Sequence, residues 1–104
     1  MERITILVCE FYGVDFEALF ENSRGNQKQT IAKSMAIVFI LEFLPTTLVA
    51  TAKYFNRTHA TIKYLNETMR GEMRVNNLRK KEYLDFKEKI KEMEFTYKNK
   101  KIRC

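Results

Sequence analysis

Glycine and proline are scarce in this sequence, with three and one residues among 104. Apolar residues make up 45% of the chain and strong helix formers are abundant. This balance disfavours turn-rich β structure and predicts an all-α fold. A chain of this length can build one compact core, but it is too short for two domains that each have a sizeable core.

Cysteine and long hydrophobic runs are also scarce. Cys9 and Cys104 provide neither a disulfide framework nor the spacing of metal ligands, so we expect a reducing, cytoplasmic compartment and no metal. The longest apolar run, residues 35–41, is stopped soon afterwards by Pro45, far short of the roughly 20 residues that a membrane span needs. Residues 1–12 do not resemble a signal peptide, so we expect no membrane association.

Groups that could carry catalysis are few. His59 is the only histidine, and no serine or cysteine lies near it in sequence with the partners that a nucleophile needs. Three dispersed glycines cannot build a phosphate-binding loop or a dinucleotide fingerprint. We therefore expect no enzyme, no catalytic residue, no cofactor and no small-molecule substrate.

Positive charge, by contrast, is plentiful: the formal net charge is +6. It is also unevenly distributed along the chain. Residues 1–22 carry five acids and one base, residues 23–63 carry six bases and one acid, and residues 70–104 carry twelve bases and six acids. One surface facing a polyanion would produce such a separation. A basic protein without such a partner can have a similar balance.

Apolar residues recur at helical spacing in successive segments. The predicted helices cover residues 2–12, 15–21, 27–43, 48–55 and 58–69. The third is apolar nearly all round in its second half and should be the central helix. Gly13 and Gly71 stand where the first and fifth should end, and Asp15, Thr46 or Thr47, and Thr58 can cap helix starts.

Only Asn56 and Arg57 separate the helix at 48–55 from Thr58. So short a connection between two helices is typical of a helix-turn-helix, although an ordinary helical hairpin looks similar from sequence. We therefore predict, for residues 1–72, a helix-turn-helix bundle of about five helices.

A C-terminal amphipathic helix is predicted at residues 78–97, followed by a frayed basic tail. Its apolar positions alternate between spacings of three and four, at Tyr83, Phe86, Ile90, Met93 and Tyr97. The seam is shorter than the roughly three to four heptads of an autonomous coiled coil. Packing of residues 73–104 on the same domain is therefore favoured over a homodimer or protein partner held through residues 78–97.

Residues 55–62 read Phe-Asn-Arg-Thr-His-Ala-Thr-Ile and resemble the Phe-Gly-Arg-Asp-His-Ser/Thr-Thr-Val signature of one family. That family is the C-terminal DNA-binding domain of the bacterial chromosomal replication initiator DnaA. The resemblance covers about residues 2–69 in the right order. Four upstream segments also match the family. Residues 11–14 are similar to its Tyr-Tyr-Gly-Ile, and residues 17–19 are similar to its Asp-Leu-Leu. Residues 23–24 correspond to its Ser-Arg, and residues 32–36 are similar to its Ala-Arg-Gln-Ile-Ala.

In that family the Asp-His-Ser/Thr positions enter the major groove of DNA, and a basic residue before the long helix reaches the minor groove. The resemblance therefore implies base contacts by Thr58, His59 and Ala60. It also implies a minor-groove contact by Lys33, with Lys28 as its substitute. The ATPase domain of the initiator has no counterpart in this chain, so we expect no ATP-dependent assembly.

The chemistry of these residues agrees with part of this assignment. His59 can donate to guanine or thymine, and Ala60 can contact a thymine methyl, although a lone histidine near a helix start is often only a cap or a surface residue. If Ile62, Leu65 and Met69 face inward, Ala60 and Lys63 face outward with Tyr64 and Glu67. Candidates for phosphate contacts are Arg24, Lys53, Arg57, Thr61 and Lys63.

Three departures from the family pattern bear on specificity. Thr58 replaces Asp, which removes an acceptor for the amino group of cytosine, and Ala60 replaces a hydroxyl residue. Lys33 replaces Arg, which keeps the charge but loses the planar guanidinium fork. The expectation is sequence-specific binding of double-stranded DNA, in replication control or transcription regulation, by a nucleoid-associated protein of a bacterium or mobile element. The alternative is a protein-interaction module of the same fold that has lost specific DNA binding.

Overall fold

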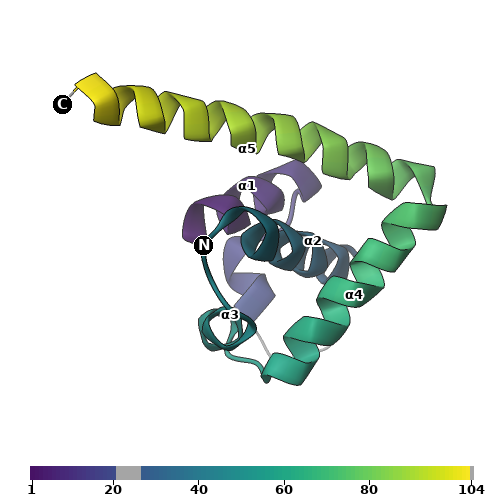
Figure 1. Cartoon of the computed structure of the whole chain (residues 1–104). Helices are drawn as coiled ribbons and strands as arrows, with labels where there is room; N and C mark the ends of the chain where they lie inside the picture. Colours follow the sequence, from purple (N-terminus) through teal and green to yellow (C-terminus); the bar gives the residue numbers. More distant parts are fainter. Residues whose placement is uncertain (21–26, 104) are drawn as a thin grey trace. The chain divides into compact units, whose positions relative to one another are not determined.

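The computed structural model describes the backbone of residues 1–20 and 27–103, and the side chains of residues 1–20 and 27–92. Regular structure within these residues is entirely helical, so the prediction of an all-α fold is confirmed. The described residues form five α-helices and one 3-10 helix (Figure 1): α1 (Glu2–Tyr12), η1 (Phe16–Phe20), α2 (Gln27–Phe43), α3 (Leu48–Phe55), α4 (His59–Val75) and α5 (Asn77–Arg103).

The chain divides into two compact units. The first spans Met1–Glu72 and holds α1, η1, α2, α3 and most of α4. The second begins at Met73 and holds the end of α4 and α5. None of the helices in the described part of the chain combines the length and the apolar character that crossing a bilayer requires.

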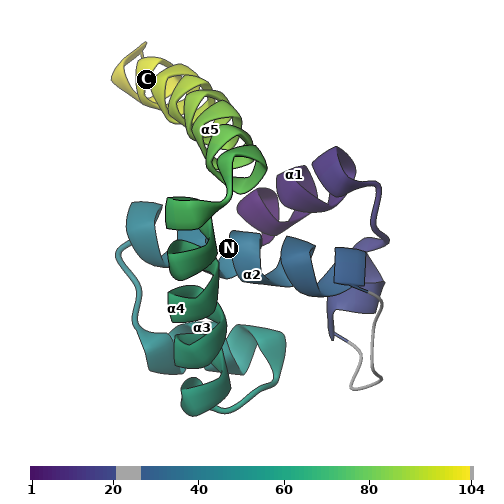
Figure 2. The same ribbon diagram turned by 90° about the vertical axis from the view of Figure 1, so that its right-hand side faces the viewer.

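Helix α2 is the central helix of the first unit, as predicted. Every residue from 34 to 40 is buried, so this stretch is covered on all sides. Helices α1, η1 and α3 all pack against α2 (Figure 2). A helix that is apolar nearly all round is stable only in such a position, because no side of it can face water without cost.

An aromatic cluster fixes the end of α3 against η1. The ring of Phe20 stacks on Phe55 with 5.5 Å between centroids and meets Tyr54 edge-on at 5.3 Å. Phe55 is fully buried. Both ring geometries lie in the favourable range for aromatic pairs, so the chain is firmly held immediately before it turns into α4.

Two of the predicted caps lie at the end of α1 and at the start of α3. Gly13 has φ 66° and ψ 37°, the left-handed conformation that ends α1. The Thr47 side chain accepts from the Ala50 N–H at 3.1 Å, so Thr47, and not Thr46, caps α3. The segment expected at 15–21 is the 3-10 helix η1, and Glu21 lies outside the described residues.

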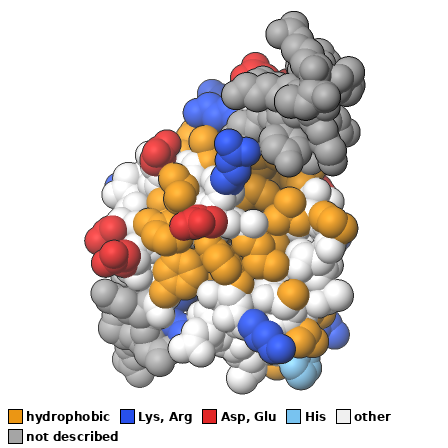
Figure 3. All heavy atoms as spheres, turned by 90° about the vertical axis from the view of Figure 1, so that its left-hand side faces the viewer, with side chains coloured by type: hydrophobic (Ala, Val, Ile, Leu, Met, Phe, Trp, Pro, Cys, Tyr) orange, Lys and Arg blue, Asp and Glu red, His pale blue; other side chains and the backbone are white. Residues whose placement is uncertain are grey.

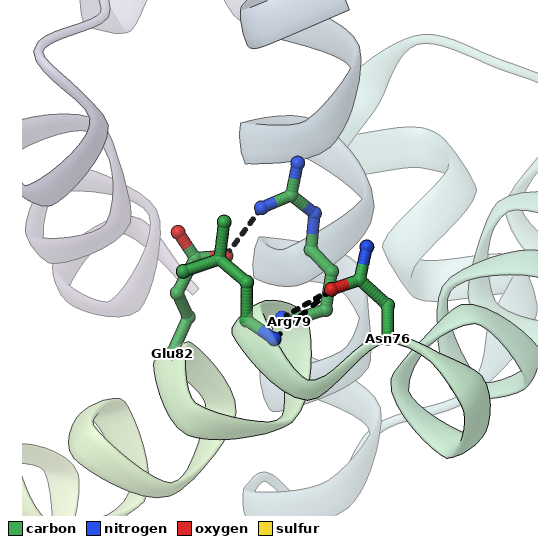
Figure 4. Close-up of polar contacts among 4 residues, drawn as sticks. Asn76, Arg79 and Glu82 are labelled. Atoms are coloured by element: carbon green, nitrogen blue, oxygen red, sulfur yellow. Dashed lines mark hydrogen bonds and ion pairs between the residues drawn. The ribbon is translucent and has the colours of Figure 1, made fainter.

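The expected end of the fifth helix at Gly71 is wrong, because α4 continues to Val75. Gly71 lies inside the helix, a position that costs up to about 1 kcal/mol relative to alanine but does not forbid helical backbone. The break comes at Asn76, whose side chain accepts from the N–H groups of Leu78 at 3.0 Å and Arg79 at 3.2 Å and so caps α5 (Figure 4). Beside this cap, Arg79 pairs with Glu82 at 2.7 Å.

Helix α5 also differs from expectation, because it extends to Arg103 and includes most of the segment predicted as a frayed tail. Side chains of residues 93–104 lie outside the described set. Placement of residues 73–104 on the first unit stays a prediction.

The two glycines should respond oppositely to substitution by alanine. Gly13→Ala should destabilise the fold by about 1 kcal/mol, because a side chain at φ 66° meets the left-handed penalty. Gly71→Ala should stabilise it by about 0.5–1 kcal/mol, since an added Cβ there meets nothing within 4 Å. Urea unfolding of both variants measures the difference, and equal shifts in the same direction would contradict these backbone assignments.

Candidate nucleic-acid interface

A short left-handed corner joins α3 to α4. Asn56 has φ 54° and ψ 50°, and the N–H groups of Asn56 and Arg57 return to the carbonyls of Lys53 at 3.2 Å and Ala52 at 2.9 Å. Asparagine tolerates positive φ better than other residues with a Cβ, and it stands here where the DnaA signature has glycine. In Figure 1, α3 is seen nearly end on while α4 runs across the page, so the two helices cross steeply.

Thr58 caps α4, as predicted. Its hydroxyl oxygen accepts from the Thr61 N–H at 3.2 Å and lies 2.9 Å from the Thr61 hydroxyl. Only one of the two hydroxyl hydrogens is used between this pair. Both residues are exposed, so the other hydrogen remains available to an acceptor outside the protein, such as a phosphate oxygen.

The outward face of α4 is the one expected from the sequence. Ile62 and Met69 are buried and Leu65 is half-buried, whereas His59, Ala60 and Lys63 are exposed, as are Tyr64 and Glu67. An ion pair between Arg70 and Glu42, 3.6 Å apart, joins α4 to the end of α2. The apolar side therefore anchors the helix and leaves its first two turns accessible from outside.

The chain on either side of this corner carries charge of one sign. Residues 43–66 contain no acid, while they contain Lys53, Arg57 and Lys63. Lys53 and Lys63 are exposed and Arg57 is half-buried. Figure 3 shows the histidine side chain at the lower margin of its face, next to Lys or Arg and hydrophobic side chains. Like charges gathered on one surface raise the local concentration of polyanions such as nucleic acids.

Lys33 belongs to the same neighbourhood. Its side chain is half-buried, and burial, followed by the positive charge of Arg57, lowers the pKa of Lys33. A residue of α2 and a residue of the corner thus lie close enough to repel each other electrostatically. This proximity joins segments far apart in the sequence, and no local pattern could have predicted it.

The other predicted basic contacts are placed less favourably or are not described. The implied minor-groove residue precedes the long helix in the DnaA family, whereas Lys28 and Lys33 both lie inside α2, which begins at Gln27. Lys28 is exposed in the first turn of α2. Arg24 lies outside the described residues. No group of three or more His, Cys, Asp or Glu side chains that could hold a metal occurs among the residues that the structure describes.

Replacing Lys33 with methionine should increase stability and weaken DNA binding at once. Because the pKa of Lys33 is lowered, its charged form disfavours folding below that pKa, and the penalty fades as the pH rises through it. Lys33→Met removes the penalty and also removes one cation, so the salt slope for duplex binding should fall by about 1.

Lys53→Met is the matched control, because Lys53 is exposed and surface substitutions change stability by only about 0.5 kcal/mol or less. Thermal unfolding and fluorescence anisotropy on duplex DNA measure the two effects. A Lys33→Met chain no more stable than Lys53→Met would contradict a cost of burying the Lys33 charge near Arg57.

Comparison with known proteins adds no relative. No protein-family model matches the chain, and no curated protein matches it at a significant level. The likeness of residues 2–69 to the DnaA DNA-binding domain therefore rests on its motifs alone.

Proposed function

We propose that this chain binds double-stranded DNA and that the first turns of α4 enter the major groove. The observation that carries the proposal is the position of His59, Ala60 and Lys63. All three are exposed at the start of a helix whose opposite side is anchored in the core. An α-helix fits the major groove when one end protrudes in this way.

Phosphate contacts would supply most of the affinity. Lys53, Arg57 and Lys63 come from the two helices and the corner that joins them, so they can contact backbone phosphates on either side of an inserted helix. Thr61 can contribute its hydroxyl. Such contacts orient the protein without reading sequence, which leaves Thr58, His59 and Ala60 as the proposed base-contacting residues.

The biological setting follows from the resemblance to DnaA. A protein with this function would act in replication control or transcription regulation, at the nucleoid of a bacterium or on a mobile element. Its role would be binding and not catalysis, with no cofactor.

Selection of bound fragments from a random duplex library tests the proposal. A specific binder should enrich a short common motif and should bind it at least about 10³-fold more tightly than random duplex. Binding without enrichment would reduce the function to sequence-independent DNA association. No binding to any duplex at low salt would contradict the proposal.

Protein interaction through residues 78–97 is the second candidate function. The exposure of Leu78 and Leu84 on α5 favours it, because apolar side chains exposed on one helix can contribute to a docking surface. Light scattering with and without duplex separates the two functions. A chain that forms oligomers and binds no DNA would favour this second function.

A further inference from the structure

The outward face of α4 carries an apolar strip that the resemblance to DnaA does not account for. Tyr64 is 59% exposed, and it lies one turn beyond Ala60, which is also exposed. Residues four apart on a helix are neighbours on its surface. The methyl group of Ala60 and the ring of Tyr64 therefore lie on the same side of the helix as the cationic side chain of Lys63.

The two acceptor groups that distinguish cytosine and adenine best, a carboxylate and a free carboxamide, are missing from the exposed part of this strip. Residues 59–66 contain no carboxylate, which is the group that accepts from the amino group of cytosine. They contain one carboxamide, Asn66, but it is half-buried and its oxygen accepts from Arg70 Nε at 3.2 Å. The bidentate amide pairing that recognises adenine is therefore not offered by the exposed part of the strip.

The strip therefore offers donors, apolar groups and hydroxyls, and a hydroxyl both donates and accepts and so discriminates little between bases. In the major groove thymine presents one acceptor, O4, and one methyl group, whereas guanine presents two acceptors and no methyl. His59 can supply the donor, and Ala60 and Tyr64 can supply the apolar contact. Thymine is the base whose edge fits both kinds of group at once.

The strip ends one turn further along. Glu67 is exposed after Tyr64, and a carboxylate close to backbone phosphates is repelled by them. Contact with the groove should therefore end at about Tyr64. This length matches a helix that enters the groove by its N-terminal end, as recognition helices do.

We propose that the exposed strip of α4 recognises thymine, with Ala60 and Tyr64 against the 5-methyl groups and His59 donating to O4. The preferred ligand is then a duplex rich in A·T pairs, with thymines clustered on the strand that faces the strip. This inference rests on the proposed function and adds Tyr64 as a residue that determines specificity.

Replacing thymidine with deoxyuridine tests it, because the exchange removes only the 5-methyl group. The probes are a short A·T duplex with its thymidines clustered on one strand, the same duplex with deoxyuridine, and a G·C duplex of equal length as a measure of sequence-independent binding. The unmodified chain should bind the thymidine duplex about four-fold more tightly than the deoxyuridine duplex for each methyl group contacted, as expected from burial of one such group.

Two substitutions at one position assign the effect to the ring. Tyr64→Ala should lower the affinity ratio of thymidine to deoxyuridine duplex to the value expected when only Ala60 contacts a methyl group. Tyr64→Phe should keep the ratio of the unmodified chain. Because Tyr64 is exposed, both variants should keep the circular dichroism spectrum of the parent.

The outcomes separate this inference from the function on which it rests. Equal affinity for the two A·T duplexes, with DNA binding intact, would overturn thymine recognition and leave the proposed function standing. An unchanged ratio in Tyr64→Ala would overturn the role of Tyr64. Failure to bind any of the three duplexes would overturn the proposed function itself.

Discussion

Raising the salt concentration from about 50 to about 200 mM should weaken duplex binding by about 100-fold, if about four phosphates are neutralised. The cations proposed to contact phosphates are Lys33, Lys53, Arg57 and Lys63. Three of them lie in the acid-free stretch at residues 43–66, and the fourth lies beside Arg57. Each phosphate contact releases condensed counterions, and added salt opposes that release.

Anisotropy titrations at several salt concentrations measure this slope. Lys63→Ala should reduce it by about 1 and weaken binding to all duplexes alike, because a phosphate contact carries no sequence information. Lys87→Ala in α5 is the control, since it removes the same charge outside the interface and should leave the slope unchanged. Binding that is insensitive to salt would contradict the electrostatic account and would favour the protein-interaction function.

His59→Ala should weaken binding to the preferred sequence by about 5- to 150-fold, the range expected when one base contact is lost. Its effect on random duplex should be much smaller, because His59 is exposed at the first position of α4 and contributes little to the phosphate contacts. The measured quantity is the ratio of affinities for selected and random duplex.

Lys63→Ala provides the comparison for this ratio as well. Both residues are exposed on the same helix, but only His59 is proposed to read a base, so only His59→Ala should lower the ratio. Equal losses on selected and random duplex in the His59 variant would remove it as a base-contacting residue.

Local sequence patterns predicted most of the fold of the first unit. Helix boundaries follow from apolar spacing and from capping residues such as Gly13, Thr47 and Thr58, and each of these acts within a few positions of the chain. The inward position of Ile62 and Met69 follows from the same spacing. Those features are local, which is why they could be inferred without coordinates.

The features that could not be predicted have other causes. Gly71 was expected to end a helix, but glycine only lowers helix stability and the neighbouring residues decided the outcome. The approach of Lys33 to Arg57 and the stacking of Phe20 on Phe55 depend on how α2, α3 and η1 pack together. Contacts between distant segments leave no periodic signal in the sequence.

In the candidate interface, too, some features could be predicted from local sequence and others could not. Exposure of His59, Ala60 and Lys63 could be inferred from helical spacing, and it is present in the structure. Lys33 was assigned through the resemblance to DnaA, and its half-buried position beside Arg57 gives it an energetic cost that the motif did not indicate. The outward position of Tyr64 also follows from helical spacing. Its proposed role in thymine recognition depends on the structure, because the hydrogen bond from Arg70 to Asn66 occupies the carboxamide that could otherwise recognise adenine.

A titration of the isotope-labelled chain with duplex DNA, followed by amide chemical shifts in NMR spectra, tests the central claim most directly. If the start of α4 enters the groove, the largest shifts should fall on residues 57–64 and on Lys53, with little change in the outer residues of α1 such as Ile6 and Glu10. Shifts concentrated in α1 or α5, with residues 57–64 unaffected, would contradict it.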